Sequence, residues 1–139
     1  MRILVIDGQG GGIGKALIGA LRAKLGSQAE ITALGTNAAA TSSMLKAGAD
    51  MGATGENAVV VCAPKADVIL GSVGILAADA MLGEISPAMA RAVADSPAEK
   101  VLIPLNRCGI HVVGTEKISL QQSLAGAVEA VVQINGPKS

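Results

Sequence analysis

The order of apolar segments predicts an α/β fold, with a mostly parallel sheet and helices on both of its faces. An apolar run at residues 2–7 leads directly into a glycine-rich loop, and a helical pattern follows the loop. A second strand pattern at 31–34 and a second helical pattern at 38–47 complete a βαβα unit, whose crossover makes the two strands parallel. The chain of 139 residues suffices for one sizeable core, so we expect a single domain over residues 1–139.

The first half of the chain carries clear local signals. The first apolar run does not alternate with polar residues, which is typical of a parallel strand covered on both faces. Apolar residues then recur at helical spacing from Ile13 to Leu25, and Gly26 stands where a glycine commonly ends a helix. Gly48 ends the second helical pattern in the same way. Residues 48–57 are rich in glycine and polar side chains, which predicts a loop that is mobile or contacts a ligand.

The middle of the chain allows two interpretations. Residues 58–62 are short and β-branched, which predicts a strand, with a short helix as the alternative. Only four residues separate this segment from the next predicted strand, 67–71, and a parallel crossover needs about a dozen or more. One of these two strands should therefore be antiparallel, and we expect 58–62 to be the antiparallel one, at an edge of the sheet. A buried helix is expected at 75–82.

The last third of the chain begins with a strong helix signal. Ser86 and Pro87 are typical of an N-cap and a first helical position, and the pattern continues to Asp95. Residues 100–105 predict a strand. A short turn leads from it to 110–113, which we expect to pair with it as a hairpin.

The last helix is predicted from its cap. Ser119 and Gln122 have the spacing of a capping box, and apolar residues recur at helical spacing from Leu120 to Val131. The segment Asn135-Gly136-Pro137 ends the pattern.

Charge and hydropathy exclude several classes of partner. Lysine and arginine number 11, as do aspartate and glutamate, so no net field attracts nucleic acid or an anionic membrane. The uncharged apolar stretch 68–78 is far shorter than the roughly 20 apolar residues of a membrane span. The apolar run after Met1 is too short for a signal peptide, and the two cysteines form no disulfide framework. We expect a cytoplasmic protein with no nucleic-acid or membrane partner.

The core must be built without aromatic side chains, because the chain contains no Phe, Tyr or Trp. Aromatic residues usually supply much of the buried area of a core. Close packing through alanine and glycine compensates for this loss in part. Association of two copies would compensate further, so we expect a homodimer or another homo-oligomer.

The loop after the first strand is the strongest functional signal. Five of the seven residues 8–14 are glycine, far more than a tight turn needs. A strand, a glycine loop and a helix N-terminus together hold phosphates, because backbone amides can approach the anion and the helix dipole favours its charge. The predicted nucleotide-binding residues of this loop are Asp7, Gly8, Gln9, Gly10, Gly11, Gly12, Ile13, Gly14 and Lys15.

Each specific form of this motif lacks a part. The glycine spacing fits short-chain dehydrogenase-like domains, but the absence of tyrosine excludes their Tyr-x-x-x-Lys pair. The segment ending in Lys15 resembles the deviant P-loop of MinD- and ParA-type ATPases, but Ala16 stands where Ser or Thr would hold magnesium, and Gly10 where a lysine is expected. The second strand ends without the acid that binds an NAD ribose, and no arginine follows for NADP. We therefore predict NAD(P) or an adenine nucleotide, with magnesium only as the nucleotide's counter-ion.

Asp7 has several possible roles. It could hold that magnesium ion, reach a ribose or act as a base. Alternatively, it could accept amide hydrogen bonds that shape the glycine loop.

Further site residues are expected at the carboxyl ends of the other strands, where ligands of parallel sheets bind. They are Thr36, Asn37, Gly71, Ser72, Asn106 and Arg107. Asn37 is equally consistent with a helix cap. Cys108 fits a buried, inert thiol better than a nucleophile. His111 is the single histidine and has no partners at metal-ligand spacing, so no metal site is predicted.

Several segments together resemble the domain-of-unknown-function family 3842, a family of short bacterial proteins. The resemblance rests on residues 7–15, 34–38, 52–57, 81–85 and 103–108. It implies a single Rossmann-like domain in a bacterial cytoplasm and adds no catalytic residue.

Three functional hypotheses follow. The first is a nucleotide-binding module that acts as a sensor or as a subunit of a larger assembly. The second is a small enzyme that uses the nucleotide for oxidoreductase or phosphate-transfer chemistry, with Asp7, Lys15, Ser72 or Arg107 as polar participants. The third is a scaffold that binds only a protein partner. The sequence alone does not decide between them.

Overall fold

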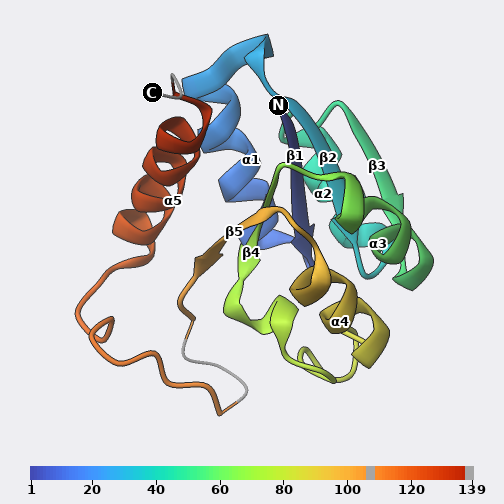
Figure 1. Cartoon of the computed structure of the whole chain (residues 1–139). Helices are drawn as coiled ribbons and strands as arrows, with labels where there is room; N and C mark the ends of the chain where they lie inside the picture. The colour runs from blue at the N-terminus through green and yellow to red at the C-terminus, as the bar shows by residue number, and fades with distance from the viewer. Residues whose placement is uncertain (106–108, 137–139) are drawn as a thin grey trace.

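The computed structural model describes residues 1–105 and 109–136, and this part of the chain forms an α/β domain around one five-stranded sheet (Figure 1). The strand order is β3-β2-β1-β4-β5, and each of the four pairings is parallel. The strands are β1 (Arg2–Asp7), β2 (Glu30–Gly35), β3 (Met51–Thr54), β4 (Val68–Ser72) and β5 (Glu99–Ile103).

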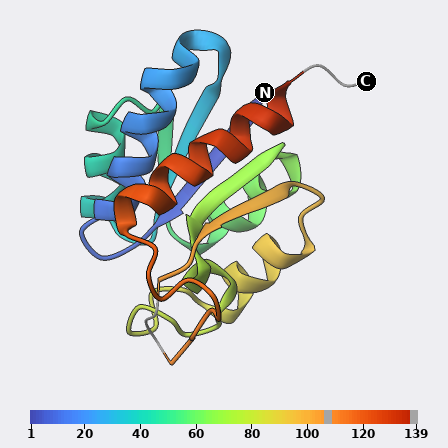
Figure 2. The same ribbon diagram turned by 90° about the vertical axis from the view of Figure 1, so that its left-hand side faces the viewer.

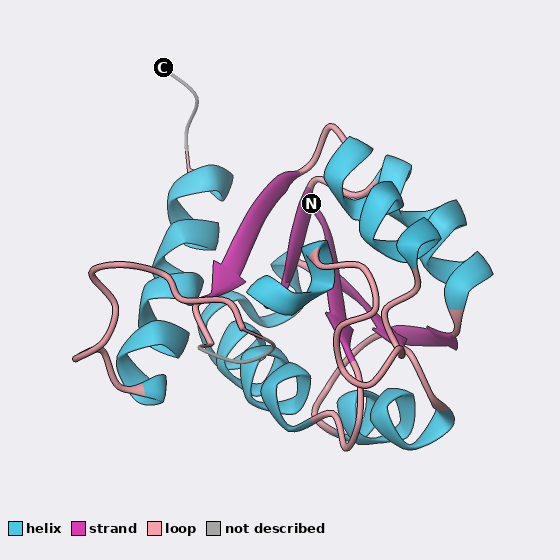
Figure 3. Ribbon diagram, turned by 90° about the horizontal axis from the view of Figure 1, so that it is seen from below, coloured by secondary structure: helices cyan, strands magenta, loops and turns pink. Residues whose placement is uncertain are grey.

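Helices cover both faces of this sheet, as Figures 2 and 3 show. The helices are α1 (Gly12–Leu25), α2 (Ala38–Lys46), α3 (Glu56–Cys62), α4 (Pro87–Asp95) and α5 (Leu120–Asn135). Helices α1, α2 and α5 pack on one face, and α3 and α4 pack on the other. Along β1, Ile3 and Val5 point into the first layer, whereas Leu4 and Ile6 point into the second. A strand buried on both faces explains the unbroken apolar run of the sequence.

The local signals at helix ends are confirmed. The Ser86 hydroxyl accepts from the Met89 N–H before Pro87, the first residue of α4. Ser119 and Gln122 form the expected capping box of α5. Gly26 follows α1 with φ 54°, a conformation that glycine adopts without steric cost. These signals depend on a few neighbouring residues, so the sequence is sufficient to predict them.

The prediction of a strand at 58–62 is wrong, because these residues lie in α3. Val59 is buried, whereas Val60 and Val61 are 40% and 46% exposed, which is the pattern of a helix with one inner face. The loop predicted at 48–57 contains β3, whose four residues are all exposed. The connection from β3 to β4 therefore passes through helix α3, as a parallel crossover requires. The predicted antiparallel edge strand does not occur among the described residues.

Two further predictions after β4 are wrong. The segment expected as a buried helix at 75–82 forms only a 3₁₀ turn, Val73–Leu76, followed by turns. Asp79, Met81 and Leu82 have positive φ, which no right-handed helix can contain. Residues 110–113 form no strand, and β5 pairs only with β4 within the described chain. The turn expected at 106–108 lies outside the described residues.

The described helices include none with the length and apolar character that would span a membrane.

Candidate functional site

A pocket lies at the carboxyl end of the sheet, at the point where the strand order changes direction. The chain passes from β1 to β2 and β3 on one side, and from β4 to β5 on the other. Loops leave β1 and β4 in opposite directions at such a switch point, and ligands of open α/β sheets bind in the crevice between them. The residues that line the pocket are Asp7, Gly8, Gln9, Ile13, Ser72, Gly74, Met81 and Leu105.

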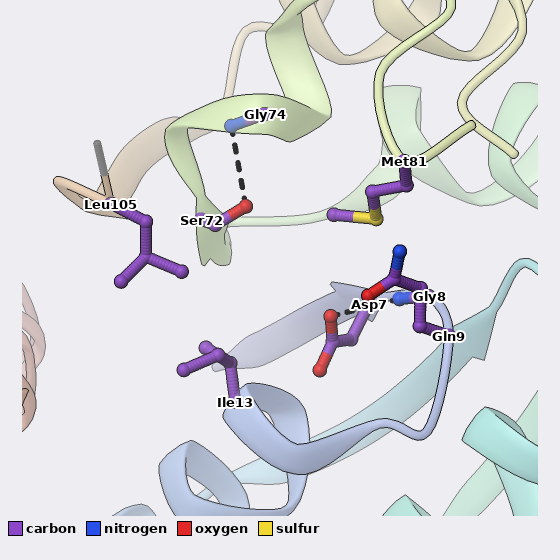
Figure 4. Close-up of a pocket in the computed structure, with 8 residues that line it drawn as sticks. All are labelled: Asp7, Gly8, Gln9, Ile13, Ser72, Gly74, Met81 and Leu105. Carbon is purple, nitrogen blue, oxygen red and sulfur yellow. Dashed lines mark hydrogen bonds between the residues drawn. The ribbon is translucent and has the colours of Figure 1, made fainter. Parts of the chain in front are cut away.

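The pocket has apolar ends and a polar centre. Figure 4 shows Ile13 and Leu105 at one end and Met81 at the other, with Asp7 and Ser72 between them. The cavity has a volume of about 90 Å³. Small-molecule pockets typically measure about 300–1,000 Å³. The site therefore has the position of a ligand pocket but is narrow in this conformation.

Ser72 presents a usable hydroxyl to this pocket. Its oxygen accepts a hydrogen bond from the Gly74 N–H at 3.2 Å, which caps the 3₁₀ turn after β4. Its proton is donated to no acceptor in the described part of the chain. A ligand oxygen could accept it. Gly71, also predicted as a site residue, does not line the pocket, and a Cβ there would lie 2.7 Å from the Ile6 carbonyl oxygen.

The Asp7 carboxylate is directed into its own loop. Its two oxygens accept from the N–H groups of Gly8 at 2.8 Å and Gly14 at 2.7 Å. The side chain is buried, and burial raises the pKa of this carboxyl above its ordinary value. The amide bonds from Gly14 and Gly8 oppose that rise, and the nearby charge of Glu84 adds to it. Asp7 thus fills part of the α1 N-terminus that a phosphate occupies in many nucleotide sites.

The glycines of the loop differ in what the fold requires of them. Gly8 lies against Thr36, Gly11 has φ 75° and lies against Ala40, and Gly14 lies against Met44, so a side chain at any of these would collide. At Gly10 and Gly12 an added Cβ would meet nothing within 4 Å. The N–H groups of Gly10 and Gly12 also donate to no group that the structure describes.

The structure adds one residue that sequence reasoning missed, Glu84. One oxygen of its carboxylate accepts from the Gln9 N–H at 2.8 Å, from the Asn37 amide at 3.0 Å and from the Thr36 hydroxyl. The Thr36 bond, followed by the Gln9 bond, lowers the pKa of Glu84 below its ordinary value. The family-like segment 81–85 was the one signal in the sequence that included this residue.

The predicted site residues are therefore brought together in part. Thr36 meets the glycine loop through Glu84, and Asn37 meets it both through Glu84 and by donating to the Gln9 carbonyl oxygen at 2.9 Å. Asn37 also caps α2 by accepting from the Ala40 N–H. Lys15 is exposed, does not line the pocket and forms no ion pair with the described residues. Asn106 and Arg107, like Cys108, lie outside the described residues. Across residues 1–105 and 109–136 no group of three or more His, Cys, Asp or Glu side chains could hold a metal ion.

A solved structure shares this fold. It is the crystal structure of a dodecameric FMN-dependent UbiX-like decarboxylase from Escherichia coli O157:H7. The match has a TM-score of 0.53 at 16% sequence identity and covers 99% of this chain and 96% of that one. At this identity the likeness concerns the fold alone. No protein with a curated description matches the chain.

The sequence itself matches a family model over residues 2–135, almost its whole length. The description of that family is "Domain of unknown function (DUF3842)", in agreement with the resemblance in the segments around the glycine loop, Glu84 and the end of β5. This chain therefore belongs to the DUF3842 family.

Proposed function

We propose that this protein is a nucleotide-binding module whose ligand lies in the pocket between the loops after β1 and β4. The observation that carries the proposal is the position of the pocket at the switch point of the sheet, beside a glycine loop with two N–H groups that donate to none of the described residues. Gly10 and Gly12 carry those N–H groups. The space beside each of these glycines is open, because no described atom lies within 4 Å of a Cβ added there.

The residues around the pocket offer separate places for two parts of the ligand, its phosphate and an apolar ring. The phosphate would lie beside the glycine loop, within reach of the backbone N–H groups of residues 9–12. An apolar ring would lie between Ile13, Leu105 and Met81, with the Ser72 hydroxyl as a donor. Asp7 would keep the loop in shape from below without contacting the phosphate, because its oxygens already accept from the loop.

Flavin mononucleotide is the first candidate, because the solved structure of similar fold is described as FMN-dependent. NAD, NADP and adenine nucleotides remain the other candidates. In a thermal-shift panel, a ligand at a hundred times its Kd should stabilise the protein by about 2.7 kcal/mol, a shift of about 10 °C at this size. No shift with any of these ligands would instead favour the scaffold hypothesis.

The substitution Gly12→Val should weaken nucleotide binding by at least about tenfold, because its side chain would occupy the space that the phosphate needs. Stability should change by no more than about 0.5 kcal/mol, because nothing lies within 4 Å of the added Cβ. Isothermal titration calorimetry and urea unfolding measure the two effects.

Gly19→Val is the matched control. Gly19 is also an exposed glycine of α1, and an added Cβ there meets no described atom within 4 Å, but it lies seven residues further along the helix, away from the glycine loop. The control should fold and bind as the wild type does. Equal affinity of all three proteins for the nucleotide would show that the glycine loop does not hold the ligand.

A further inference from the structure

Three hydrogen-bond donors converge on one point beside the glycine loop. The Gln9 N–H comes from the loop after β1, and the Thr36 hydroxyl and the Asn37 amide come from the loop after β2. All three donate to the same oxygen of Glu84, a residue of the loop after β4. Donors from separate segments that surround one anionic oxygen form the kind of site that also binds a phosphate oxygen.

The loop that carries Glu84, residues 77–86, also narrows the pocket. Met81 lines the pocket and lies against Gly8. A Cβ added at Gly8 would lie 2.8 Å from the Met81 sulfur. Figure 4 shows Met81 directed toward Gln9 and Gly8. The cavity, at about 90 Å³, is smaller than typical small-molecule pockets of about 300–1,000 Å³, and Met81 of this loop forms part of its wall.

The same loop is held in an unfavourable backbone conformation. Asp79, Met81 and Leu82 have φ of 67°, 59° and 58°, in the left-handed region that residues with a Cβ seldom occupy. The Leu82 side chain is 98% exposed, so its packing does not compensate for this. The loop is held down by the buried side chains Ala80 and Ile85 and by the hydrogen bonds of Glu84. Part of the cost of these backbone conformations is recovered when the loop changes conformation.

We propose that Gln9, Thr36 and Asn37 form a subsite for a phosphate monoester, which Glu84 fills in the absence of ligand. A phosphate offers more acceptor oxygens and more charge than one carboxylate oxygen, so it competes for these donors and releases the 77–86 loop. This inference rests on the proposed nucleotide-binding function and adds to it the group that is recognised and the loop that opens.

Two kinds of ligand carry this chemistry. One is a mononucleotide with a 5′-phosphate, and the other is NADP with its 2′-phosphate. Each has a partner that lacks only that phosphate, so FMN is compared with riboflavin and NADP with NAD. If the phosphate changes the affinity in only one of these pairs, that pair identifies which kind of ligand the subsite binds.

The test measures Kd for both pairs with the wild type, Glu84→Gln and Thr36→Val. Glu84→Gln keeps the shape of the side chain but removes the competing charge, so the phosphorylated ligand should bind roughly three- to tenfold tighter. Thr36→Val removes one donor at nearly constant volume, so the same ligand should bind several-fold more weakly. The unphosphorylated partner should change much less in both variants.

Opposite signs are the decisive feature of this result. If Glu84 were only a structural clamp, both variants would loosen the same loop and shift both members of a pair in one direction. Glu56→Gln is the matched control, because the Glu56 carboxylate accepts from the Ser86 hydroxyl at 2.5 Å, at the last residue of the loop, and from none of the three donors. It should leave the affinity ratio between phosphorylated and unphosphorylated ligand unchanged.

Hydrogen exchange gives a second reading. The Gly83 and Ile85 N–H groups donate within the loop, to the carbonyl oxygens of Asp79 and Ala80. Their exchange should quicken when the phosphorylated ligand binds. Slower or unchanged exchange, or a looser Glu84→Gln complex, would overturn the subsite.

Failure of the subsite is distinct from failure of the proposed function. Nucleotide binding that Gly12→Val weakens, with a phosphate preference unaffected by Glu84→Gln and Thr36→Val, would refute the subsite alone. Absence of binding to all four ligands in the wild type and in Glu84→Gln would refute both.

Discussion

Replacing Gly35 with alanine should destabilise the protein by about 3 kcal/mol, near the upper end for overpacking. Gly35 ends β2, and an added Cβ would lie 2.5 Å from the Thr41 backbone nitrogen and 2.8 Å from the Asn37 carbonyl oxygen. Both atoms belong to the start of α2, so the clash is relieved only if the helix itself moves away. Urea unfolding followed by circular dichroism measures the loss.

Gly10→Ala is the control for this prediction. Gly10 is also at the carboxyl end of the sheet, yet an added Cβ there meets nothing within 4 Å. Its free energy of unfolding should stay within about 0.5 kcal/mol of the wild type. Equal stability of Gly35→Ala and Gly10→Ala would show that α2 does not rest directly on the end of β2.

The substitution Asp7→Ala should destabilise the protein by about 3 kcal/mol. It leaves the N–H groups of Gly8 and Gly14 without their acceptor in a buried place, at a cost of about 1–3 kcal/mol for each group. Asp7→Asn retains one acceptor oxygen and should lose about half as much. Equal losses in the two variants would show that the retained oxygen does not satisfy either amide.

The pH dependence of stability tests the state of Asp7. Its pKa is raised in the folded protein, so the folded state binds this proton more tightly than the unfolded state. The contribution of Asp7 to stability therefore increases as the pH falls from neutral through the folded pKa, and levels off below the ordinary value of 3.8. On acidification the wild type should gain stability relative to Asp7→Asn.

Other carboxylates act in the opposite direction, which is why the variant is needed. The pKa values of Glu84 and Asp50 are lowered on folding, so the stability they contribute above their ordinary pKa is lost in acid. These contributions are the same in the wild type and in Asp7→Asn, except for the electrostatic interaction between Asp7 and Glu84, which the variant lacks. Unfolding by urea at several pH values from about 7 down to about 4 gives the difference. A difference that does not change over this range would contradict the raised pKa.

The segments that sequence reasoning predicted well are those whose cause is local. The run at β1 is apolar without alternation because both of its faces are covered. The ends of α1, α4 and α5 follow from a glycine, a Ser-Pro pair and a capping box, each within a few residues. The glycine loop was identified for the same reason.

The segments predicted wrongly depend on distant neighbours. The apolar residues of 58–62 suit a strand or a helix equally, and only packing of Val59 against the sheet makes them helical. The exposed strand β3 has no burial pattern of its own and is a strand because it pairs with β2. The loop 77–86 contains left-handed residues and is held by contacts with the loops after β1 and β2, which no local propensity encodes.

By itself, the sequence determined the α/β class, the family and the place of the glycine loop, because periodicity, caps and glycines act over short distances. The tertiary structure decided that the sheet is entirely parallel within the described residues and that the pocket lies between β1 and β4. It also brought Glu84 to Thr36 at the end of β2, 48 residues away along the chain. The end of β2 has no acid of its own in the sequence, and folding supplies one there because the loop after β4 crosses the glycine loop.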